Sequence, residues 1–509
     1  MKSRTQNSIR NILFGTVDKI ITLLMPFVIR TIMIKTLGPA YLGLSNLFTS
    51  VFTVLGLAEL GVGSAMVYAM YRPLAEGNKA AVSALLELYR KVYLIIGTFI
   101  LSAGLALMPF LRRLIKDGTP PDLNLYIIYL LSLSQAVISY FFGAYRSSLL
   151  FAMQRSDISS AIDILVRVVL YAVAITGLLT TKSYYLYASL FPIATLVTNV
   201  ILSYTVKKHY PEYLCGGTVD RETQIGIFRN VVALFGHKVG TVLANSIDTL
   251  SISAFLGLSQ IAIYGNYHHV AKSLSTLTGM LSGGITASVG NSLVLESPQK
   301  NYQTFVTINF LNVFITGVCC ACLISLYQHF INLWVGPDFL FDFDMVIAFT
   351  VYFYVKCIRQ IPLTYKDAAG MWAKDALKPY VEGICNLILN IVLVQIIGVR
   401  GVILSTIFTM LFIAFPWESR ILMKHVFHTG SGAFVARFFY YTLATILACF
   451  AAYRVCELLP PVGIAALLAK GVVSAAVASF LFAVLFFPLP EYKSAIQFCL
   501  KMIKHRKKH

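Results

Sequence analysis

The chain has 509 residues, of which 58% are hydrophobic and 12% are charged, with a formal net charge of +19 and a mean hydropathy of +0.75. Soluble domains contain about 25% charged residues, so this composition excludes an ordinary soluble protein and indicates a polytopic membrane protein. The positive charge does not point to nucleic acid, because the basic residues flank apolar runs instead of forming one basic patch.

Apolar runs long enough to cross a membrane follow one another along the chain. A spanning helix needs about 20 mainly apolar residues, and we count fourteen such runs: 11–36, 43–71, 92–111, 125–145, 158–180, 184–206, 231–256, 262–294, 303–328, 344–365, 380–398, 401–419, 438–457 and 463–487. The first run is too long for a signal peptide and is not followed by a small-residue cleavage site, so we expect a retained helix. The connections are short and leave no room for a catalytic domain outside the membrane.

Lysine and arginine gather in the loops on the side of the N-terminus. These loops hold Arg72, Lys79, Arg90, Lys91, Arg146, Arg155, Lys207 and Lys208, whereas the opposite side holds mainly Arg112, Arg113 and Lys116. The positive-inside rule therefore places both termini in the cytoplasm, and we expect the chain to lie in a cytoplasmic membrane. The tail "KMIKHRKKH" suits an anionic inner leaflet.

The two halves of the chain resemble each other. "RNILFGTVDK" begins at Arg10 and "RNVVALFGHK" begins at Arg229, so that Lys19 corresponds to Lys238. The same offset of 219 residues carries Leu37-Gly38 onto Leu256-Gly257, and it changes by only a few residues further along. A nearly constant offset over several helices indicates an internal repeat. Because six helices return the chain to the same side, the repeat is parallel, as in some alternating-access transporters.

We therefore predict an all-α polytopic membrane protein with 14 transmembrane helices, built from two six-helix lobes of a parallel repeat and two C-terminal helices. The predicted parts are a first lobe over 1–215, a second lobe over 216–430, the two extra helices over 431–490 and a basic cytoplasmic tail over 491–509.

Several basic residues lie inside the predicted spans, where a charge is costly and usually faces a protein interior or a wet cavity. At about 100° per residue, Lys19 and Arg30 share one helix face and are separated by roughly 16 Å along the axis. Lys238 lies at the depth of Lys19 in the repeat, and Lys356 and Arg359 are neighbours at (i, i+3). Together with Lys272, these residues are candidates for binding an anionic substrate group.

Each of these bases also has a simpler structural interpretation. Lys19, Lys238 and Lys272 could reach an interface with their long side chains, as we expect for Lys35. Asp163 and Arg167 are spaced (i, i+4), and they most simply pair with each other. The repetition of Lys19 as Lys238 favours a role in a cavity for these two residues.

The buried acids and one histidine leave two interpretations open. Asp18, Glu59, Asp248 and Glu382, with His237, either neutralise the buried bases or bind a coupling proton or sodium ion. The nine cysteines lie mostly in apolar runs without partner histidines, so we expect no metal site. No phosphate-binding loop and no hydrolase motif is present, so we expect no catalytic residues and no cofactor.

Four stretches resemble a known family. "TLGPAYLGLSNLF" at 36–48, "GLAELGVGSAMVYAMYRPLAEGNKAAV" at 56–82, "YRSSLLFAMQR" at 145–155 and "FINLWVGPDF" at 330–339 are similar to bacterial polysaccharide flippases of the Wzx type. These belong to the multidrug/oligosaccharidyl-lipid/polysaccharide exporter superfamily. The resemblance implies two six-helix lobes around a central cavity, with Lys19, Arg30 and Lys238 as head-group contacts. It also implies a lipid groove formed by the spans 438–457 and 463–487.

The leading hypothesis is a flippase for cell-surface polysaccharide biosynthesis. It would move a polyprenyl-pyrophosphate-linked oligosaccharide from the cytoplasmic to the outer leaflet by alternating access, beside other proteins of polysaccharide assembly. One alternative is a drug or other small-molecule exporter of the same superfamily, which the cation-rich interior disfavours. Another alternative is a membrane-embedded polysaccharide polymerase or ligase, which would need a sizeable outer loop and catalytic groups near one interface.

Overall fold

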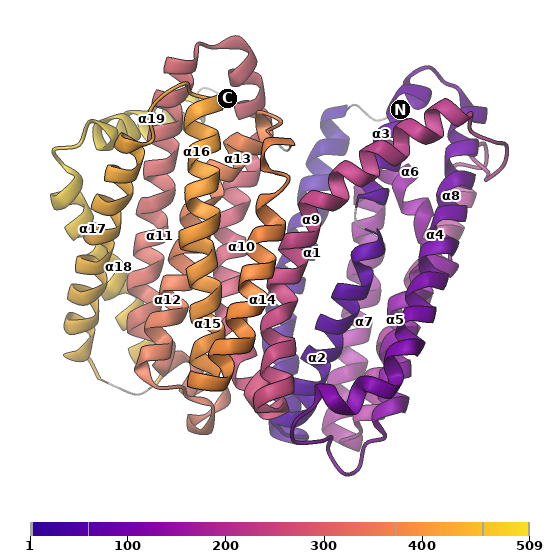
Figure 1. Cartoon of the computed structure of the whole chain (residues 1–509), viewed down its shortest axis with the longest axis horizontal. Coiled ribbons are helices and arrows are strands. Elements are labelled where there is room, and N and C mark those ends of the chain that lie inside the picture. Colours follow the sequence, from indigo (N-terminus) through magenta and orange to yellow (C-terminus); the bar gives the residue numbers. More distant parts are fainter. Residues whose placement is uncertain (1–3, 60, 372, 461–462, 507–509) are drawn as a thin grey trace. The chain divides into compact units, whose positions relative to one another are not determined.

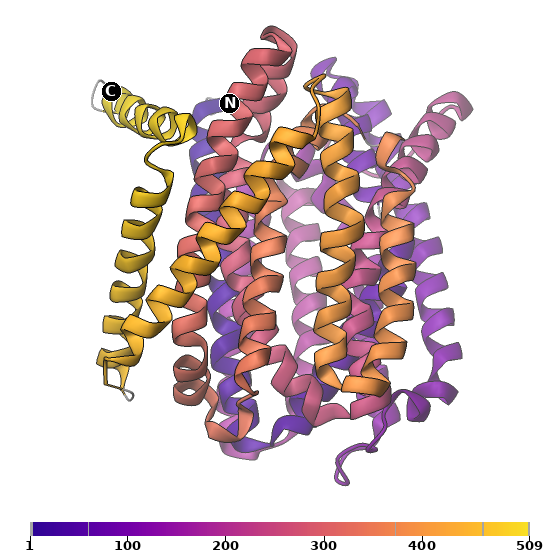
Figure 2. The same ribbon diagram turned by 60° about the vertical axis from the view of Figure 1, so that its left-hand side comes forward.

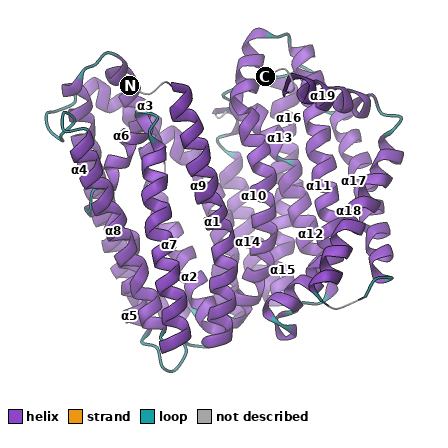
Figure 3. Cartoon of the chain, turned by 180° about the vertical axis from the view of Figure 1, so that it is seen from behind, coloured by secondary structure: helices purple, strands orange, loops and turns teal. Residues whose placement is uncertain are grey.

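The computed structural model describes residues 4–59, 61–371, 373–460 and 463–506. All regular structure within these ranges is helical, as Figure 3 shows. The chain divides into two compact units, Met1–Ala262 and Ile263–His509, and each unit is described by itself.

The first unit is a bundle of long helices joined by short turns. Its elements are α1 (Arg4–Thr36), α2 (Pro39–Leu55), η1 (Gly56–Glu59), α3 (Val62–Ala75), α4 (Lys79–Leu107), η2 (Met108–Leu114), α5 (Leu125–Phe141), η3 (Ala144–Arg146), α6 (Ser147–Ala152), α7 (Ser156–Thr181), α8 (Tyr184–His209) and α9 (Arg221–Leu256). α1 packs along α7, α5 packs against α4 and α8, and α9 packs on α2 and α3 (Figure 1). The unit therefore groups α9 with the helices before it, whereas the predicted lobe boundary lies at 215.

The second unit is a bundle built around one long helix, α11. Its elements are α10 (Leu258–Leu295), which begins just before the unit does, α11 (Pro298–Val335), η4 (Pro337–Phe339), α12 (Phe343–Ile358), α13 (Gln360–Ala368), η5 (Ala373–Asp375), α14 (Lys378–Ile397), α15 (Val399–Phe408), the π-helical turn η6 (Thr409–Ala414), α16 (Phe415–His425), α17 (Gly432–Glu457), α18 (Ile464–Phe486) and α19 (Pro490–Arg506). α11 packs against α12, α17 and α18, and the pair α17 and α18 stands beside it in Figure 2.

Two glycines that the predicted repeat pairs have the same backbone conformation. Gly38 has φ 108° and ψ 170° before α2, and Gly257 has φ 94° and ψ 173° after α9. Side chains disfavour a positive φ, and a Cβ at Gly257 would lie 1.7 Å from Oδ2 of Asp117, so glycine is required there. This local match agrees with the repeat, which itself stays a prediction together with the domain limits at 215 and 430.

The polytopic class is confirmed, but the predicted number of spans is not. Among the described residues, ten helical segments are long and apolar enough to cross a membrane, or eleven if α5 and the segment 144–152, bent by 50° from each other, form one span. The three other predicted spans, 11–36, 231–256 and 262–294, are the helices α1, α9 and α10. Each of these three helices includes side chains outside the described residues, and only described residues enter the count.

Candidate functional site

A polar cavity of about 500 Å³ lies among α2, α5 and α8 of the first unit. Much of its wall consists of hydroxyl and amide side chains, namely Ser45, Thr49, Thr53, Ser132, Gln135, Ser139, Tyr184, Tyr187 and Thr195. Most of the rest is formed by the aromatic rings of Phe48, Phe52 and Phe191. Hydroxyl and amide groups both donate and accept hydrogen bonds. This wall, which we call the hydroxyl cavity, is therefore suited to a ligand with many hydroxyl groups of its own.

Arg30 lies beside the hydroxyl cavity. It is buried in α1, with 9% of its surface exposed, and its Nη1 donates to Oδ1 of Asn46 at 3.4 Å. Asn46 follows the cavity residue Ser45 along α2, and the cavity residue Tyr187 is an electrostatic neighbour of the guanidinium. The structure thus places one predicted base next to a polar cavity, where a buried cation favours an anionic ligand.

The other charged residues of α1 lie on a different part of the helix. Asp18 forms an ion pair with Arg167 of α7, with 2.6 Å between Oδ1 and Nη1, while Lys19 is exposed. The expected partner of Arg167 was Asp163 on its own helix. Because (i, i+4) pairs contribute only about 0.2–0.5 kcal/mol, the tight packing of α1 on α7 can give Arg167 a different partner.

Glu59 is held by tyrosines at the break between α2 and α3. The hydroxyls of Tyr93 and Tyr140 each donate to its carboxylate at 2.5 Å, and Tyr89 donates to Tyr93 at 2.9 Å. Within the described part of the chain, no lysine or arginine lies at ion-pair distance from Glu59. Glu59 is therefore a partly buried acid that is stabilised by hydrogen bonds and not by a cation.

In the second unit, two predicted bases from different helices come together. Nζ of Lys356 on α12 donates to the hydroxyl of Tyr352 at 3.0 Å, and Nε2 of His268 on α10 lies 3.2 Å from the same hydroxyl. Lys272, one turn further along α10, is exposed and is an electrostatic neighbour of Lys356. This arrangement places Lys356 at the hydroxyl of Tyr352, with Lys272 near Lys356.

Arg359, by contrast, is neutralised inside the second unit. Its Nε and Nη2 donate to Glu418 of α16 at 2.9 and 2.7 Å, and its Nη1 lies 3.7 Å from Glu382. Lys378 also donates to Glu418. All four side chains are buried or nearly so, so Arg359 and Glu382 belong to a buried ion network that we call the α12–α16 ion cluster.

Comparison with known proteins places the chain in a family. Residues 8–289 match the family model described as "Polysaccharide biosynthesis protein". The chain belongs to the polysaccharide biosynthesis protein family. Comparison with curated protein sequences gives no significant match.

Solved structures similar to this family member include a lipid flippase and two transporters. The lipid II flippase MurJ in an inward closed conformation aligns with a TM-score of 0.70 at 13% identity, over 94% of this chain and 99% of that chain. An inward-facing multidrug resistance MATE family transporter of the MOP superfamily gives 0.59 at 14% identity, over 80% and 96%. A MOP superfamily transporter from Pyrococcus furiosus, described by the reverse polarity of its binding pocket, gives 0.54 at 12% identity, over 82% and 96%.

The family match confirms the predicted resemblance to polysaccharide biosynthesis proteins, and the solved structures show that the fold is similar to that of MATE and MurJ. The chain is a multi-pass membrane protein of polysaccharide biosynthesis with the fold of a transporter. Among the described residues, no group of three or more His, Cys, Asp or Glu side chains is placed to hold a metal ion.

Some predicted residues cannot be assigned to a site in this family member. The side chains of His237 and Lys238 lie outside the described residues, so the pairing of Lys238 with Lys19 stays a prediction. Asp248 is buried in α9, with 6% of its surface exposed.

The sequence analysis missed residues whose role depends on packing. Glu418 lies at the end of the apolar run 401–419, where it is the one acid, and that position could have drawn attention to it. Tyr93, Tyr140 and Tyr352 carry no such signal, because tyrosines are common throughout this chain and only the fold brings these three to their charged partners.

Proposed function

We propose that this chain is a flippase that translocates a polyprenyl-pyrophosphate-linked oligosaccharide from the cytoplasmic to the outer leaflet by alternating access. Family membership supports a substrate from polysaccharide assembly, and the superfamily fold supports transport. The observation that carries the proposal is Arg30 beside the hydroxyl cavity, since the two together suit a ligand with an anionic phosphate and a hydroxyl-rich glycan.

The proposed head-group contacts are bases that lie beside the hydroxyl cavity, near another base, or at matching positions of the predicted repeat. Arginine binds phosphate through its planar fork, and lysine binds it as a point charge. Arg30 lies beside the hydroxyl cavity, Lys272 and Lys356 are electrostatic neighbours, and the predicted repeat adds Lys19 and Lys238. Arg359 is not among the proposed contacts, because Nε and Nη2 of its guanidinium already donate to Glu418.

We further propose Glu59 as the residue that binds a coupling proton or cation. Asp18 is paired with Arg167 and Glu382 lies beside Arg359, so neither acid is available without first breaking an ion pair. Glu59 has tyrosine hydroxyls as partners, and these can stay in place whether the carboxylate is charged or protonated.

The test is a flipping assay with the purified protein in liposomes. A fluorescent polyprenyl-pyrophosphate-linked oligosaccharide is placed in both leaflets, and the accessible fraction is measured with a membrane-impermeant quencher. Wild-type protein should make all of the lipid accessible over time. A hydrogen bond to a charged group is worth about 1.5–3 kcal/mol, so Arg30→Ala should slow flipping by about 10-fold to 100-fold.

Two further variants make this test specific. Arg72→Ala removes an arginine that is 88% exposed and paired only with Glu76, and it should flip the lipid at the wild-type rate. The double variant Lys19→Ala with Lys238→Ala tests the predicted repeat, and an unchanged rate would remove these two residues from the head-group site. If wild-type liposomes transport a cationic dye but leave the labelled lipid in place, the flippase proposal is wrong and the exporter alternative is favoured.

A further inference from the structure

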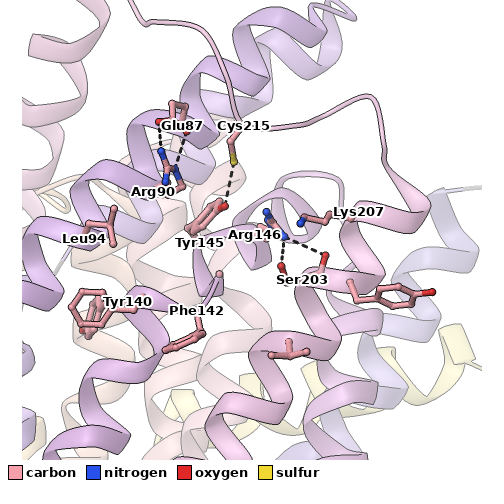
Figure 4. A pocket seen from close by; sticks show the side chains of 14 residues that line it. Glu87, Arg90, Leu94, Tyr140, Phe142, Tyr145, Arg146, Ser203, Lys207 and Cys215 are labelled. Carbon is pink, nitrogen blue, oxygen red and sulfur yellow. Dashed lines mark hydrogen bonds and ion pairs between the residues drawn. The ribbon is translucent and has the colours of Figure 1, made fainter.

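A second cavity of the first unit, separate from the hydroxyl cavity, lies between α4, the end of α5, and α8. Its volume is about 670 Å³, and Figure 4 shows it from close by. The residues that define it chemically are Arg90, Arg146, Lys207, Tyr145, Phe142 and Val200. We call it the basic cavity. None of the proposed head-group bases lines it, and neither does Glu59, although the Glu59 partner Tyr140 does.

The basic side chains that line the basic cavity outnumber the acidic side chains that could neutralise them. Its wall contains three cationic side chains and one acidic side chain, Glu87. Glu87 already forms an ion pair with Arg90, which donates to both of its carboxylate oxygens at 2.9 and 2.7 Å. Within the described residues, neither Arg146 nor Lys207 has an acid at ion-pair distance, so two cations remain to attract an anion.

The fold holds Arg146 in position. The chain bends by 50° after α5, and Gly143 takes φ 83° at this bend, a conformation that glycine adopts without strain. The bend directs Nη1 of Arg146 to the hydroxyl of Ser203 on α8, with the guanidinium carbon 5.5 Å from the ring centre of Tyr145. In Figure 4 the nitrogen atoms of Arg146 and Lys207 turn toward the same part of the cavity.

The outer rim of the basic cavity is apolar and exposed. Phe142 is 50% exposed, Val200 is 53% exposed and Tyr204, which also lines the cavity, is 65% exposed. Side chains of this kind are exposed without penalty where they contact acyl chains. Arg90, Arg146 and Lys207 all belong to the end of the helices that the positive-inside rule places at the cytoplasmic leaflet.

From this arrangement we infer that the basic cavity binds the phosphate group of an anionic membrane lipid of the inner leaflet. Basic pockets between transmembrane helices on the cytoplasmic side suit anionic head groups. Arg146 and Lys207 contact the phosphate, Ser203 and Tyr145 hold Arg146 in place, and the apolar rim contacts the acyl chains. A soluble phosphate ester offers the same anionic group but would leave this rim without a partner. The inference does not depend on the proposed transport function.

The experiment measures lipid binding to the purified full chain in nanodiscs. Native mass spectrometry counts the phosphatidylglycerol molecules retained as this lipid replaces phosphatidylcholine. A basic residue near an anionic surface is worth about 1 kcal/mol, so Lys207→Gln should weaken retention of the tightest-bound phosphatidylglycerol about fivefold. Arg146→Gln should weaken it at least as much.

A matched control separates a site from general surface charge. Lys208 is the next residue on α8 and is also exposed, but it does not line the basic cavity; its ammonium lies over the ring of the lining residue Tyr204. Lys208→Gln should retain the lipid as wild type does, and equal losses for Lys207→Gln and Lys208→Gln would overturn the inference. Because Lys207 is exposed, we expect its variant to fold, so this pair remains informative even if Arg146→Gln fails to fold.

A second measurement distinguishes the source of the phosphate. Cys215 lines the basic cavity, with Sγ 3.3 Å from the hydroxyl of Tyr145. Its alkylation rate, followed by peptide mass spectrometry, should fall several-fold when phosphatidylglycerol is added. Millimolar inorganic phosphate in pure phosphatidylcholine nanodiscs should leave the rate unchanged. Protection by inorganic phosphate as strong as that by the lipid would overturn the assignment to a lipid.

Discussion

Arg359, at the C-terminal cap of α12, and Glu418 on α16 form a two-pronged ion pair, with Nε and Nη2 donating to the two carboxylate oxygens at 2.9 and 2.7 Å. Glu418 is 1% exposed, and Lys378 donates to the same carboxylate. One acid therefore compensates two buried cations, which makes Glu418 central to the α12–α16 ion cluster.

Replacing Glu418 should destabilise the second unit strongly. Glu418→Gln leaves the charges of Arg359 and Lys378 buried with less compensation, and breaking a buried pair in this way costs about 3–5 kcal/mol. We expect a fall in the apparent Tm of the purified protein in detergent, measured by the fluorescence of a thiol-reactive dye or by light scattering. The double variant Arg359→Met with Glu418→Met removes one charge of each sign, and it should be less damaging than Glu418→Gln alone. A double variant at least as unstable as the single one would show that the ion pair itself stabilises the fold.

The ion pair between Asp18 and Arg167 should contribute modestly to stability and not to ion coupling. Both side chains are partly exposed, at 25% and 29%, and pairs of this kind contribute about 0.2–1 kcal/mol. In a double-mutant cycle with Asp18→Asn and Arg167→Gln, we expect a coupling free energy in this range. Asp18→Asn should also leave the dependence of flipping on an ion gradient unchanged. Loss of that dependence would assign the coupling role to Asp18 instead of Glu59.

The sequence predicted the helices more reliably than their breaks and partners. Apolar length alone identifies segments such as α11 and α18, because a spanning helix must satisfy its backbone internally. The break at Gly56–Glu59 and the bend at Gly143 fall inside predicted spans, since one or two glycines hardly change the average hydropathy of a run. These breaks nevertheless position Glu59 and Arg146.

The predicted site residues were identified by charge, and charge alone does not reveal the partner. Arg30 and Arg359 are both buried arginines within predicted apolar spans. Arg30 lies beside the hydroxyl cavity, whereas Arg359 forms an ion pair with Glu418. The difference arises because Glu418 of α16, which lies 59 residues after Arg359 in the sequence, contacts it in the fold. Helical periodicity describes one helix at a time, so it could not predict this contact.

The hydroxyl cavity should recognise the glycan and not the lipid. Thr49→Val keeps the side-chain shape but removes a hydroxyl from the cavity wall, and one hydrogen bond is worth about 1 kcal/mol. We expect about fivefold slower flipping of a lipid that carries the full oligosaccharide, and little change for the same lipid with a single sugar. Thr180→Val is the matched control, since Thr180 makes the same hydrogen bond to the carbonyl four residues earlier but lies outside the cavity. Equal effects on both substrates would mean that Thr49 supports the fold and does not read the glycan.

Glu59 should determine whether an ion gradient drives flipping. Glu59→Gln keeps two groups that can pair with the hydroxyls of Tyr93 and Tyr140 but cannot bind and release a proton. In liposomes with an imposed pH or sodium gradient, wild-type flipping should accelerate, whereas the variant should flip at one slow rate with or without the gradient. Tyr140→Phe removes one of the two hydrogen bonds and should give intermediate acceleration.

Glu76→Gln provides the control for Glu59. Glu76 is an exposed acid at the end of α3 and pairs with Arg72, so its variant should respond to the gradient as wild type does. If Glu59→Gln retained the full acceleration, the role of Glu59 would be structural. Its carboxylate would connect the break between α2 and α3 to Tyr93 of α4 and Tyr140 of α5 by hydrogen bonds. The coupling ion would then have to bind elsewhere, and Asp248, buried in α9, would be the next acid to replace.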